Sequence, residues 1–155
     1  MLAGKWTYRS FRNDPKLIAG DPAAALALIL DEGVFDLDAD GATGFRGALG
    51  TGTGYALALA GELVGSQAHP GRFFITGDGL DGTATEGWRY AFRGFVGPQW
   101  PDAVGQVASL LGTVIRIAGH GPDAPAGVTA SFIAVRQQEG DRPRPARRPV
   151  LMAGS

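Results

Sequence analysis

The sequence predicts an all-β fold, an eight-stranded antiparallel up-and-down β-barrel with a short helical excursion near residues 21–30. Short runs that alternate with period two, or that are rich in β-branched and aromatic residues, recur along the chain and are typical of strands. Glycine is abundant, at 25 of 155 residues, and with Asp and Pro it marks the segments between these runs as turns. Short turns join antiparallel neighbours, and closing eight strands into a barrel removes both exposed sheet edges.

Eight runs are expected to form the strands, in sequence order. Most of the segments between them, such as "DADG" and "AHPG", hold the Gly, Asp or Pro that tight turns need. The expected strands are residues 4–13, 33–39, 43–49, 54–65, 71–78, 85–96, 107–119 and 127–138.

Residues 14–32 interrupt this series. Asp21 is suited to cap a helix, Pro22 suits the first helical position, and "AAALALIL" contains good helix formers. A short helix that covers one mouth of the barrel is therefore predicted. The alternative is a strand that starts near residue 25 and runs into "EGVFDLDA".

The composition limits the classes of protein to which the chain can belong. Its length suits a single β-barrel domain, here expected over residues 1–139, and the absence of cysteine excludes disulfides and thiol catalysis. A net charge of −1 gives no reason to expect nucleic acid or a membrane as a partner, and no apolar run approaches the roughly 20 residues of a membrane-spanning helix. The start "MLAGKWTYRSF" lacks the pattern of a signal peptide, so a cytoplasmic protein is expected.

The last segment differs from the rest in composition. Residues 140–155 carry four arginines and one aspartate, and prolines interrupt them repeatedly. Proline removes the donors that a sheet needs and arginine resists burial, so a flexible tail is predicted. Binding of this tail to an acidic partner is the alternative.

The opening "GKW", Gly4 to Trp6 on the first expected strand, resembles the Gly-x-Trp signature of the calycins, that is, lipocalins and avidins. In lipocalins the tryptophan closes the barrel floor and an arginine from the last strand packs across it, a role that the resemblance assigns to Arg136 in "SFIAVR". The segment "GVFDLDADGATGFRGALG" is similar to the second and third strands of avidin-type barrels. The resemblance covers the strand order over residues 4–138 and implies an internal cavity for a small, mostly apolar ligand. The chain lacks the second lipocalin motif and the biotin-ligating residues of avidins, so biotin binding is not implied.

The stretch "EGWRYAFRGF" concentrates aromatic residues in one expected strand. Trp88, Tyr90 and Phe92 fall on every second residue, with Arg89 and Arg93 between them. Side chains alternate between the two faces of a strand, so the three rings are expected to point into the barrel. An eight-stranded barrel either fills with side chains or holds one small ligand, and the rings fit both arrangements.

The first functional hypothesis is a barrel that binds a small hydrophobic molecule in an aromatic-lined cavity. Arg116, which shares a strand face with His120 if the strand continues that far, is its expected polar anchor, for example for a carboxylate. If that face points outward, Arg116 is only solvated. The expected ligand-binding residues are Trp6, Tyr8, Phe35, Tyr55, Trp88, Tyr90, Arg116 and Phe132.

Two other classes of function stay open at this point. One is a cofactor-free enzyme of the isomerase or cyclase type, which would use Tyr90, Glu86 or Arg116 in the same cavity. The other is a structural barrel with a filled interior that forms homo-oligomers. This alternative follows from residues 107–119, whose "SLLGTVIRI" is apolar on both faces.

No cofactor and no metal site is predicted. The chain has two histidines, His69 and His120, too few for a histidine-based metal site without added carboxylates. "DLDADG" matches the first half of a calcium-binding loop, but Gly47 stands at the twelfth position, where that loop needs a glutamate. A strand that ends in a tight turn explains these aspartates better.

Overall fold

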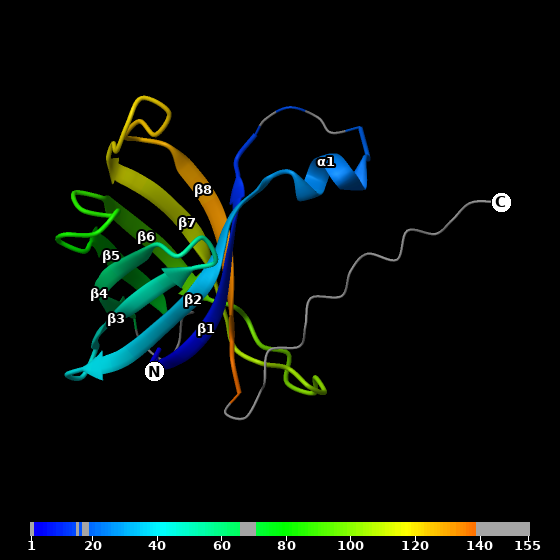
Figure 1. Cartoon of the computed structure of the whole chain (residues 1–155). Coiled ribbons are helices and arrows are strands. Elements are labelled where there is room, and N and C mark those ends of the chain that lie inside the picture. Colours follow the sequence, from blue (N-terminus) through cyan, green and yellow to red (C-terminus); the bar gives the residue numbers. More distant parts are fainter. Residues whose placement is uncertain (1, 15, 17–18, 66–70, 139–155) are drawn as a thin grey trace.

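Eight strands follow one another around a closed barrel in the computed structural model, which describes residues 2–14, 16, 19–65 and 71–138. Each strand pairs antiparallel with its neighbours in sequence, and the last returns to the first (Figure 1). The fold class predicted from the sequence is therefore confirmed. The strands are β1 (Gly4–Arg12), β2 (Ile29–Asp40), β3 (Gly44–Thr51), β4 (Ala56–Val64), β5 (Arg72–Gly79), β6 (Arg89–Val96), β7 (Ser109–Ala118) and β8 (Thr129–Arg136).

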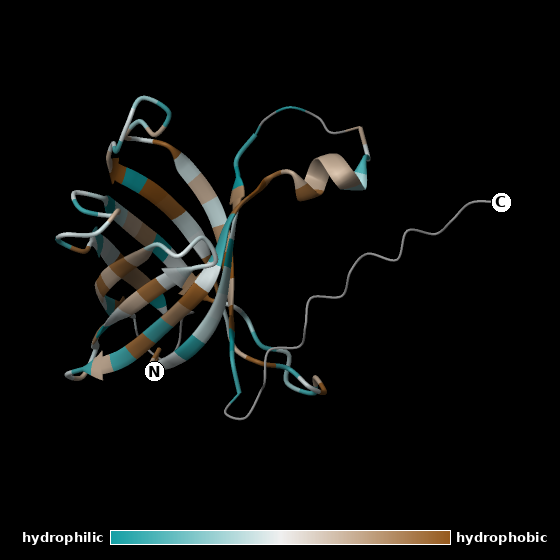
Figure 2. Cartoon of the chain, in the orientation of Figure 1, coloured by the Kyte–Doolittle hydropathy of each residue, from teal (hydrophilic) through white to brown (hydrophobic). Residues whose placement is uncertain are grey.

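Alternation along the strands separates the barrel interior from its surface. On β1, Trp6 and Tyr8 are buried whereas Lys5 is exposed. On β2, apolar residues alternate with aspartates, and Figure 2 shows this strand in bands of brown and teal. The exposed side of neighbouring strands carries ion pairs such as Lys5–Asp36, at 2.9 Å. Such exposed pairs contribute at most about 1 kcal/mol each, so burial of the inward-facing side chains stabilises the barrel.

One end of the barrel is closed by the contact that the calycin resemblance assigned. Trp6 and Arg136 are direct partners across β1 and β8, and the Arg136 guanidinium carbon lies 5.6 Å from the centre of the Trp6 ring. The Trp6 indole N–H donates to the Leu2 carbonyl oxygen at 2.9 Å, which satisfies the only polar atom of this buried side chain. These residues form the barrel floor.

Aromatic rings fill the middle of the barrel above this floor. Tyr8 and Phe35 lie 4.9 Å apart between ring centres, and Phe35 meets Phe92 edge to face at 5.5 Å. Phe132 packs against both Tyr8 and Phe92. Edge-to-face and tilted arrangements are the favourable ones for aromatic pairs, so this cluster is a packed core.

Inward-facing glycines let adjacent strands bend closely around these rings. A Cβ atom at Gly47 of β3 would lie 1.9 Å from the Asp36 carbonyl oxygen of β2. At Gly50, on the same strand, an added Cβ would meet nothing within 4 Å. Gly47 therefore permits a close approach that any side chain would prevent, as expected where a small barrel needs strong curvature.

The helix forms where the sequence predicts it, but it is shorter and lies elsewhere. α1 (Pro22–Leu26) begins after Asp21, whose side chain accepts from the Ala23 amide at 2.9 Å. None of its residues is buried, and in Figure 1 it stands beside the barrel. The expectation of a helix over the barrel mouth is therefore wrong, because a helix this short presents no apolar face to bury. The alternative of a strand from residue 25 is wrong at its start, since Ala25 and Leu26 are helical, but β2 does begin earlier than the predicted residue 33, at Ile29.

Other expectations fall on residues beyond the described part of the chain. His69 and the tail of residues 140–155 lie outside the described residues, so the flexibility of the tail stays a prediction. Within the described ranges, no helix is long and apolar enough to cross a membrane.

Candidate functional site: a cavity at the open mouth

A cavity of about 270 Å³ opens at the barrel end opposite to the Trp6–Arg136 floor. Rings of Tyr8 and Phe92 form its base, so the central aromatic cluster separates it from the floor. The lining residues are Tyr8, Ser10, Leu30, Asp31, Leu49, Thr51, Thr53, Tyr55, Leu57, Trp88, Tyr90, Phe92, Val114, Arg116 and His120.

The register between β6 and β7 assembles one wall of this cavity. Tyr90 pairs with Arg116 and Phe92 with Val114, so all four side chains face the interior side by side. The register shifts between Arg89 and Tyr90, next to the mouth. Bulges of this kind commonly lie at barrel rims, where they change the direction of a side chain.

Two polar side chains, His120 and Arg116, contact the hydroxyl oxygen of Tyr90. The His120 Nε2 atom lies 2.7 Å from Tyr90 Oη, and the Arg116 Nε atom donates to Oη at 3.2 Å. The Arg116 Nη1 atom also donates to the Pro125 carbonyl oxygen at 3.1 Å, which holds the guanidinium in place. Which atom of the Tyr90–His120 pair donates depends on the imidazole tautomer.

Stacked rings hold His120 in this position. Trp88 lies parallel to the imidazole, with ring centres 3.9 Å apart and 13° between the planes. The Tyr55 ring packs against Trp88, with ring centres 4.9 Å apart. Aromatic side chains therefore form one continuous side of the mouth, from Tyr55 through Trp88 to Tyr90.

His120 is neutral at neutral pH because of its surroundings. Burial lowers the pKa of His120 below its ordinary value, and the neighbouring Arg116 charge lowers that pKa further. A neutral imidazole has one donor and one acceptor nitrogen. His120 therefore pairs with Tyr90 by an ordinary hydrogen bond and not as a cation.

A carboxyl group lies on the other side of the barrel. Asp31, on β2, is half-buried and lines the cavity, and its Oδ1 atom accepts from the Glu32 amide at 2.9 Å. Burial raises the pKa of Asp31; the hydrogen bond from the Glu32 amide opposes this effect, and the Glu32 charge adds to it. No ion pair of Asp31 is found among the described residues, so its charge is not balanced by a direct partner.

The Tyr8 side chain forms a polar point in the base of the cavity. Burial raises the pKa of Tyr8 well above its ordinary value, and the nearby charge of Asp31 raises that pKa further. Ser10 counteracts this effect by a hydrogen bond to the Tyr8 side chain. Tyr8 is therefore a neutral phenol at neutral pH, and it contributes a polar tip to an otherwise apolar base.

The expected ligand-binding residues divide between the cavity and the core below it. Tyr8, Tyr55, Trp88, Tyr90 and Arg116 line the cavity. Trp6, Phe35 and Phe132 are at most 4% exposed and do not line it, because the floor contact and the ring cluster enclose them. Their expected contact with a ligand is therefore corrected to a role in the core.

Glu86 is not part of the site. The sixth strand begins at Arg89 and not at residue 85, and hydrogen bonds such as Trp88 N–H to the Thr85 carbonyl fold the preceding residues into turns. The Glu86 carboxylate accepts from the Gly82 amide at 3.0 Å, in an exposed position. The hypothesis that placed Glu86 beside Trp88 in the cavity assumed a strand that does not exist there.

Asp31 was missed by the sequence reasoning, although a signal for it exists. The expected second strand started at residue 33, whereas β2 starts at Ile29. Extending the alternation of Phe35 and Leu37 back along the strand puts Asp31 on the inward face. An acidic residue on the face that otherwise carries apolar side chains is a recognisable sign of a polar site in a barrel.

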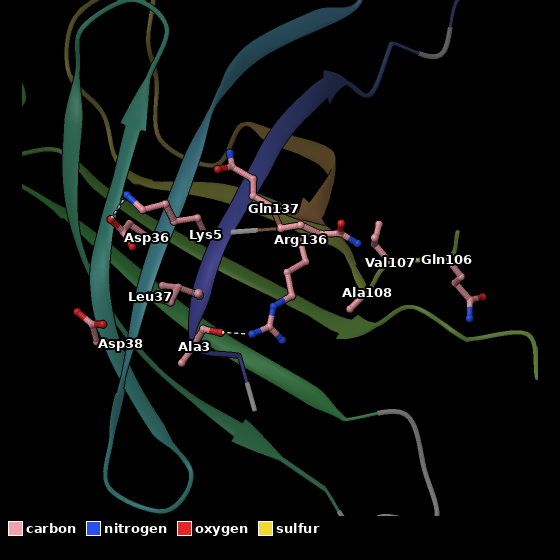
Figure 3. A pocket seen from close by; sticks show the side chains of 12 residues that line it. Ala3, Lys5, Asp36, Leu37, Asp38, Gln106, Val107, Ala108, Arg136 and Gln137 are labelled. Atoms are coloured by element: carbon pink, nitrogen blue, oxygen red, sulfur yellow. Dashed lines mark hydrogen bonds and ion pairs between the residues drawn. The ribbon is translucent and has the colours of Figure 1, made fainter. Parts of the chain in front are cut away.

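A second, wider groove lies at the floor end, and Lys5, Asp36 and Arg136 in its lining already have partners. It measures about 940 Å³ and runs between the ends of β1, β2 and β8 and residues 106–108. Figure 3 shows Lys5 directed to Asp36 and Arg136 to the Ala3 carbonyl, and the latter bond is 3.0 Å. These groups are exposed and mutually satisfied, so the mouth cavity is the better candidate for a site.

Comparisons with known proteins identify no family for this chain. No protein-family model matches it, and no curated protein does. Among solved structures, a de novo designed fluorescence-activating β-barrel is similar over 87% of this chain and 93% of its own, with 16% identity and a TM-score of 0.44. The closed barrel is established by the strand pairing of this chain, and the calycin resemblance stays a prediction.

Proposed function

We propose that this protein binds a small, mostly apolar molecule in the mouth cavity. The observation that carries the proposal is a hollow end above a filled core, where the rings of Tyr55, Trp88 and Tyr90 line a space that the protein leaves open. Ligand sites typically measure about 300–1,000 Å³, so a cavity of about 270 Å³ suits a molecule with one or two rings.

The lining also favours a particular arrangement of the ligand. Leu49, Leu57 and Val114 offer apolar contact to its body, whereas Tyr90 and Arg116 offer polar contact on one wall. A few polar groups within an apolar pocket orient a ligand and give specificity. The ligand class is therefore a ring-bearing molecule with one polar atom, most simply a carbonyl oxygen, directed to Tyr90.

Tryptophan fluorescence tests the proposal because the three tryptophans lie in different surroundings. Trp88 lines the cavity, Trp6 is buried in the floor, and Trp100 is 76% exposed. Titration with one- and two-ring ketones and phenols should quench or shift the emission in a saturable manner. The response should disappear in Trp88→Phe and persist in the matched control Trp100→Phe. Native mass spectrometry of the same mixtures should show the added mass.

Two results would contradict binding at this site. One is a flat titration with every probe, together with a bare protein mass. The other is a saturable response that Trp88→Phe leaves unchanged, which would place the ligand elsewhere.

A further inference from the structure

Two kinds of proton-carrying group face each other across the mouth cavity. Asp31 stands on β2, and Tyr90 stands on β6, four strands away in the ring of eight and so on the opposite side. Both side chains line the same cavity, and Tyr8 lies at its base. A ligand that fills the cavity therefore touches the Asp31 carboxyl group at one side and, at the other, the Tyr90 phenol, which His120 and Arg116 contact.

We propose that the cavity is a proton-transfer site in which Asp31 takes a proton from a carbon beside a carbonyl group of the ligand, while Tyr90 binds the carbonyl oxygen. The inference rests on the proposed function, because the substrate is the ligand of the cavity. The substrate class is a small cyclic ketone with one or two rings and an enolisable C–H.

The Tyr90 side is built to stabilise negative charge on an oxygen atom. When the imidazole proton is on Nε2, both His120 and Arg116 donate to Tyr90 Oη, at 2.7 and 3.2 Å. The hydroxyl proton is then left to point into the cavity toward the ligand. Two donors polarise this hydroxyl, and one of them is cationic, so its hydrogen bond strengthens as charge develops on the carbonyl oxygen.

The Asp31 side is built to accept a proton. Its Oδ1 atom is held by the Glu32 amide, and among the described residues no hydrogen bond or ion pair engages Oδ2. Burial, which raises the pKa of Asp31, makes this carboxylate a stronger base than an exposed aspartate. The titratable or charged groups around it are Tyr8 on β1, Glu32 on β2, Tyr90 on β6, and Arg116 and His120 across the cavity.

The proposed step balances without any added reagent. Asp31 takes the proton, the electrons of the C–H bond form a carbon–carbon double bond, and the carbonyl electrons move onto the oxygen held by Tyr90. Asp31 then delivers a proton back to the carbon skeleton. If the Asp31 carboxyl has first exchanged its proton for one from solvent, delivery to the same carbon gives net exchange with solvent. Delivery to the far end of a neighbouring double bond converts a β,γ-unsaturated ketone into its conjugated isomer.

Deuterium incorporation tests proton abstraction directly. The full chain is incubated with β-tetralone in heavy water. Mass spectrometry then measures the deuterium content of the recovered ketone, and a buffer-only sample gives the uncatalysed exchange. The wild-type protein should accelerate exchange, and Asp31→Asn and Tyr90→Phe should each reduce this acceleration at least tenfold. Asp36→Asn is the matched control, because Asp36 stands on the same strand but on the outer surface, paired with Lys5. It should keep the wild-type rate.

Binding of the same ketone, followed through Trp88 emission, separates the two proposals. If Asp31→Asn and Tyr90→Phe bind β-tetralone but do not exchange its protons, both proposals are supported. Binding by the wild-type protein with no exchange above buffer overturns the proton-transfer inference and leaves the proposed function standing. Unchanged exchange in Asp31→Asn overturns the assignment of the base. If the wild-type protein does not bind β-tetralone, the proton-transfer inference is overturned, and the proposed function falls with it only when every other ketone and phenol also fails to bind.

Discussion

The Tyr90 hydroxyl oxygen lies 2.7 Å from Nε2 of His120, although the two residues are 30 positions apart in the sequence. The contact exists because Tyr90 is paired with Arg116 across β6 and β7, and the chain continues from Arg116 to His120 at the mouth. Arg116 donates to the same oxygen atom. A cation, a neutral imidazole and a phenol thus meet at one atom.

Removal of the Arg116 charge should raise the pKa of His120. The arginine is the second cause, after burial, of the low pKa of this histidine, so Arg116→Met should move the value back toward 6.5 without restoring it fully. The imidazole resonances in an NMR pH titration report this value directly. An unchanged titration curve would show that the guanidinium does not act on His120, against the geometry at Tyr90 Oη.

Replacement of Asp31 should stabilise the protein at neutral pH. Its pKa is raised in the folded state, so the folded protein binds the proton more strongly than the unfolded chain does, and ionised Asp31 opposes folding above that pKa. Asp31→Asn should therefore increase the melting temperature at pH 7, and the gain should shrink as the pH falls through the Asp31 pKa. Thermal unfolding at several pH values measures this, with Asp36→Asn as the exposed control. A lower melting temperature for Asp31→Asn at pH 7 would contradict the burial argument.

The central ring cluster should dominate the stability of the barrel. Phe132→Ala removes a ring that contacts Tyr8, Phe35 and Phe92, and such truncations typically cost about 3–5 kcal/mol. Phe74→Ala, at a position 40% exposed on the outer face, should cost less than about 1 kcal/mol. Chemical denaturation gives both free energies of unfolding. Equal losses would mean that the interior is not packed as described.

A methyl group should be far less tolerated at Gly47 than at Gly50. At Gly47 it would meet the Asp36 carbonyl oxygen at 1.9 Å, whereas at Gly50 it would meet nothing within 4 Å. Gly47→Ala should lower the free energy of unfolding by about 1–3 kcal/mol or more, and Gly50→Ala should change it little. The two variants share one strand and one chemical change, so the difference measured by denaturation isolates the close approach of β2 and β3.

Self-association through the outer face stays a prediction. On β7, Ile117 is 48% exposed, and on the neighbouring strands β6 and β8 Phe95 and Val135 are each at least 36% exposed. If these side chains form a contact between copies, sedimentation velocity should show a mass that rises with protein concentration. Phe95→Ser should weaken that dependence. A monomer mass at all concentrations would remove this prediction.

The strand order was predictable because short runs with alternation or with β-branched and aromatic residues were separated by recognisable turns. Alternation also predicted the shared inward face of Tyr90 and Phe92 in "GWRYAF", whereas the seventh strand, apolar on both faces, did not reveal which way Arg116 points. The starts of the strands were harder to predict. Trp88 precedes β6, and the composition of the turn that contains it could not be distinguished from that of a strand. Predicting the start of the sixth strand too early made Glu86 a candidate for the site. Predicting the start of the second strand too late left Asp31 out of the candidate site.

The division between filled core and open cavity could not be read from the sequence. Phe35, Phe132 and Tyr90 come from three strands and look alike as aromatic residues on inward faces. Their level along the barrel decides whether they pack with other rings or border the cavity, and that level depends on the register of every strand between them. The contact of Trp6 with Arg136 was predictable because a resemblance supplied the partner.

The seam between β1 and β8 sets the order in which the chain can fold. Trp6 meets Arg136 across that seam, and Ala3 and Arg136 are 133 positions apart. Contacts between distant parts of a chain form late, because loop closure must precede them. During synthesis, β1 and β7 therefore keep unpaired edges until the last strand emerges. The barrel cannot close before β8 pairs with both of these strands, so the last strand also removes the two edges at which another chain could pair.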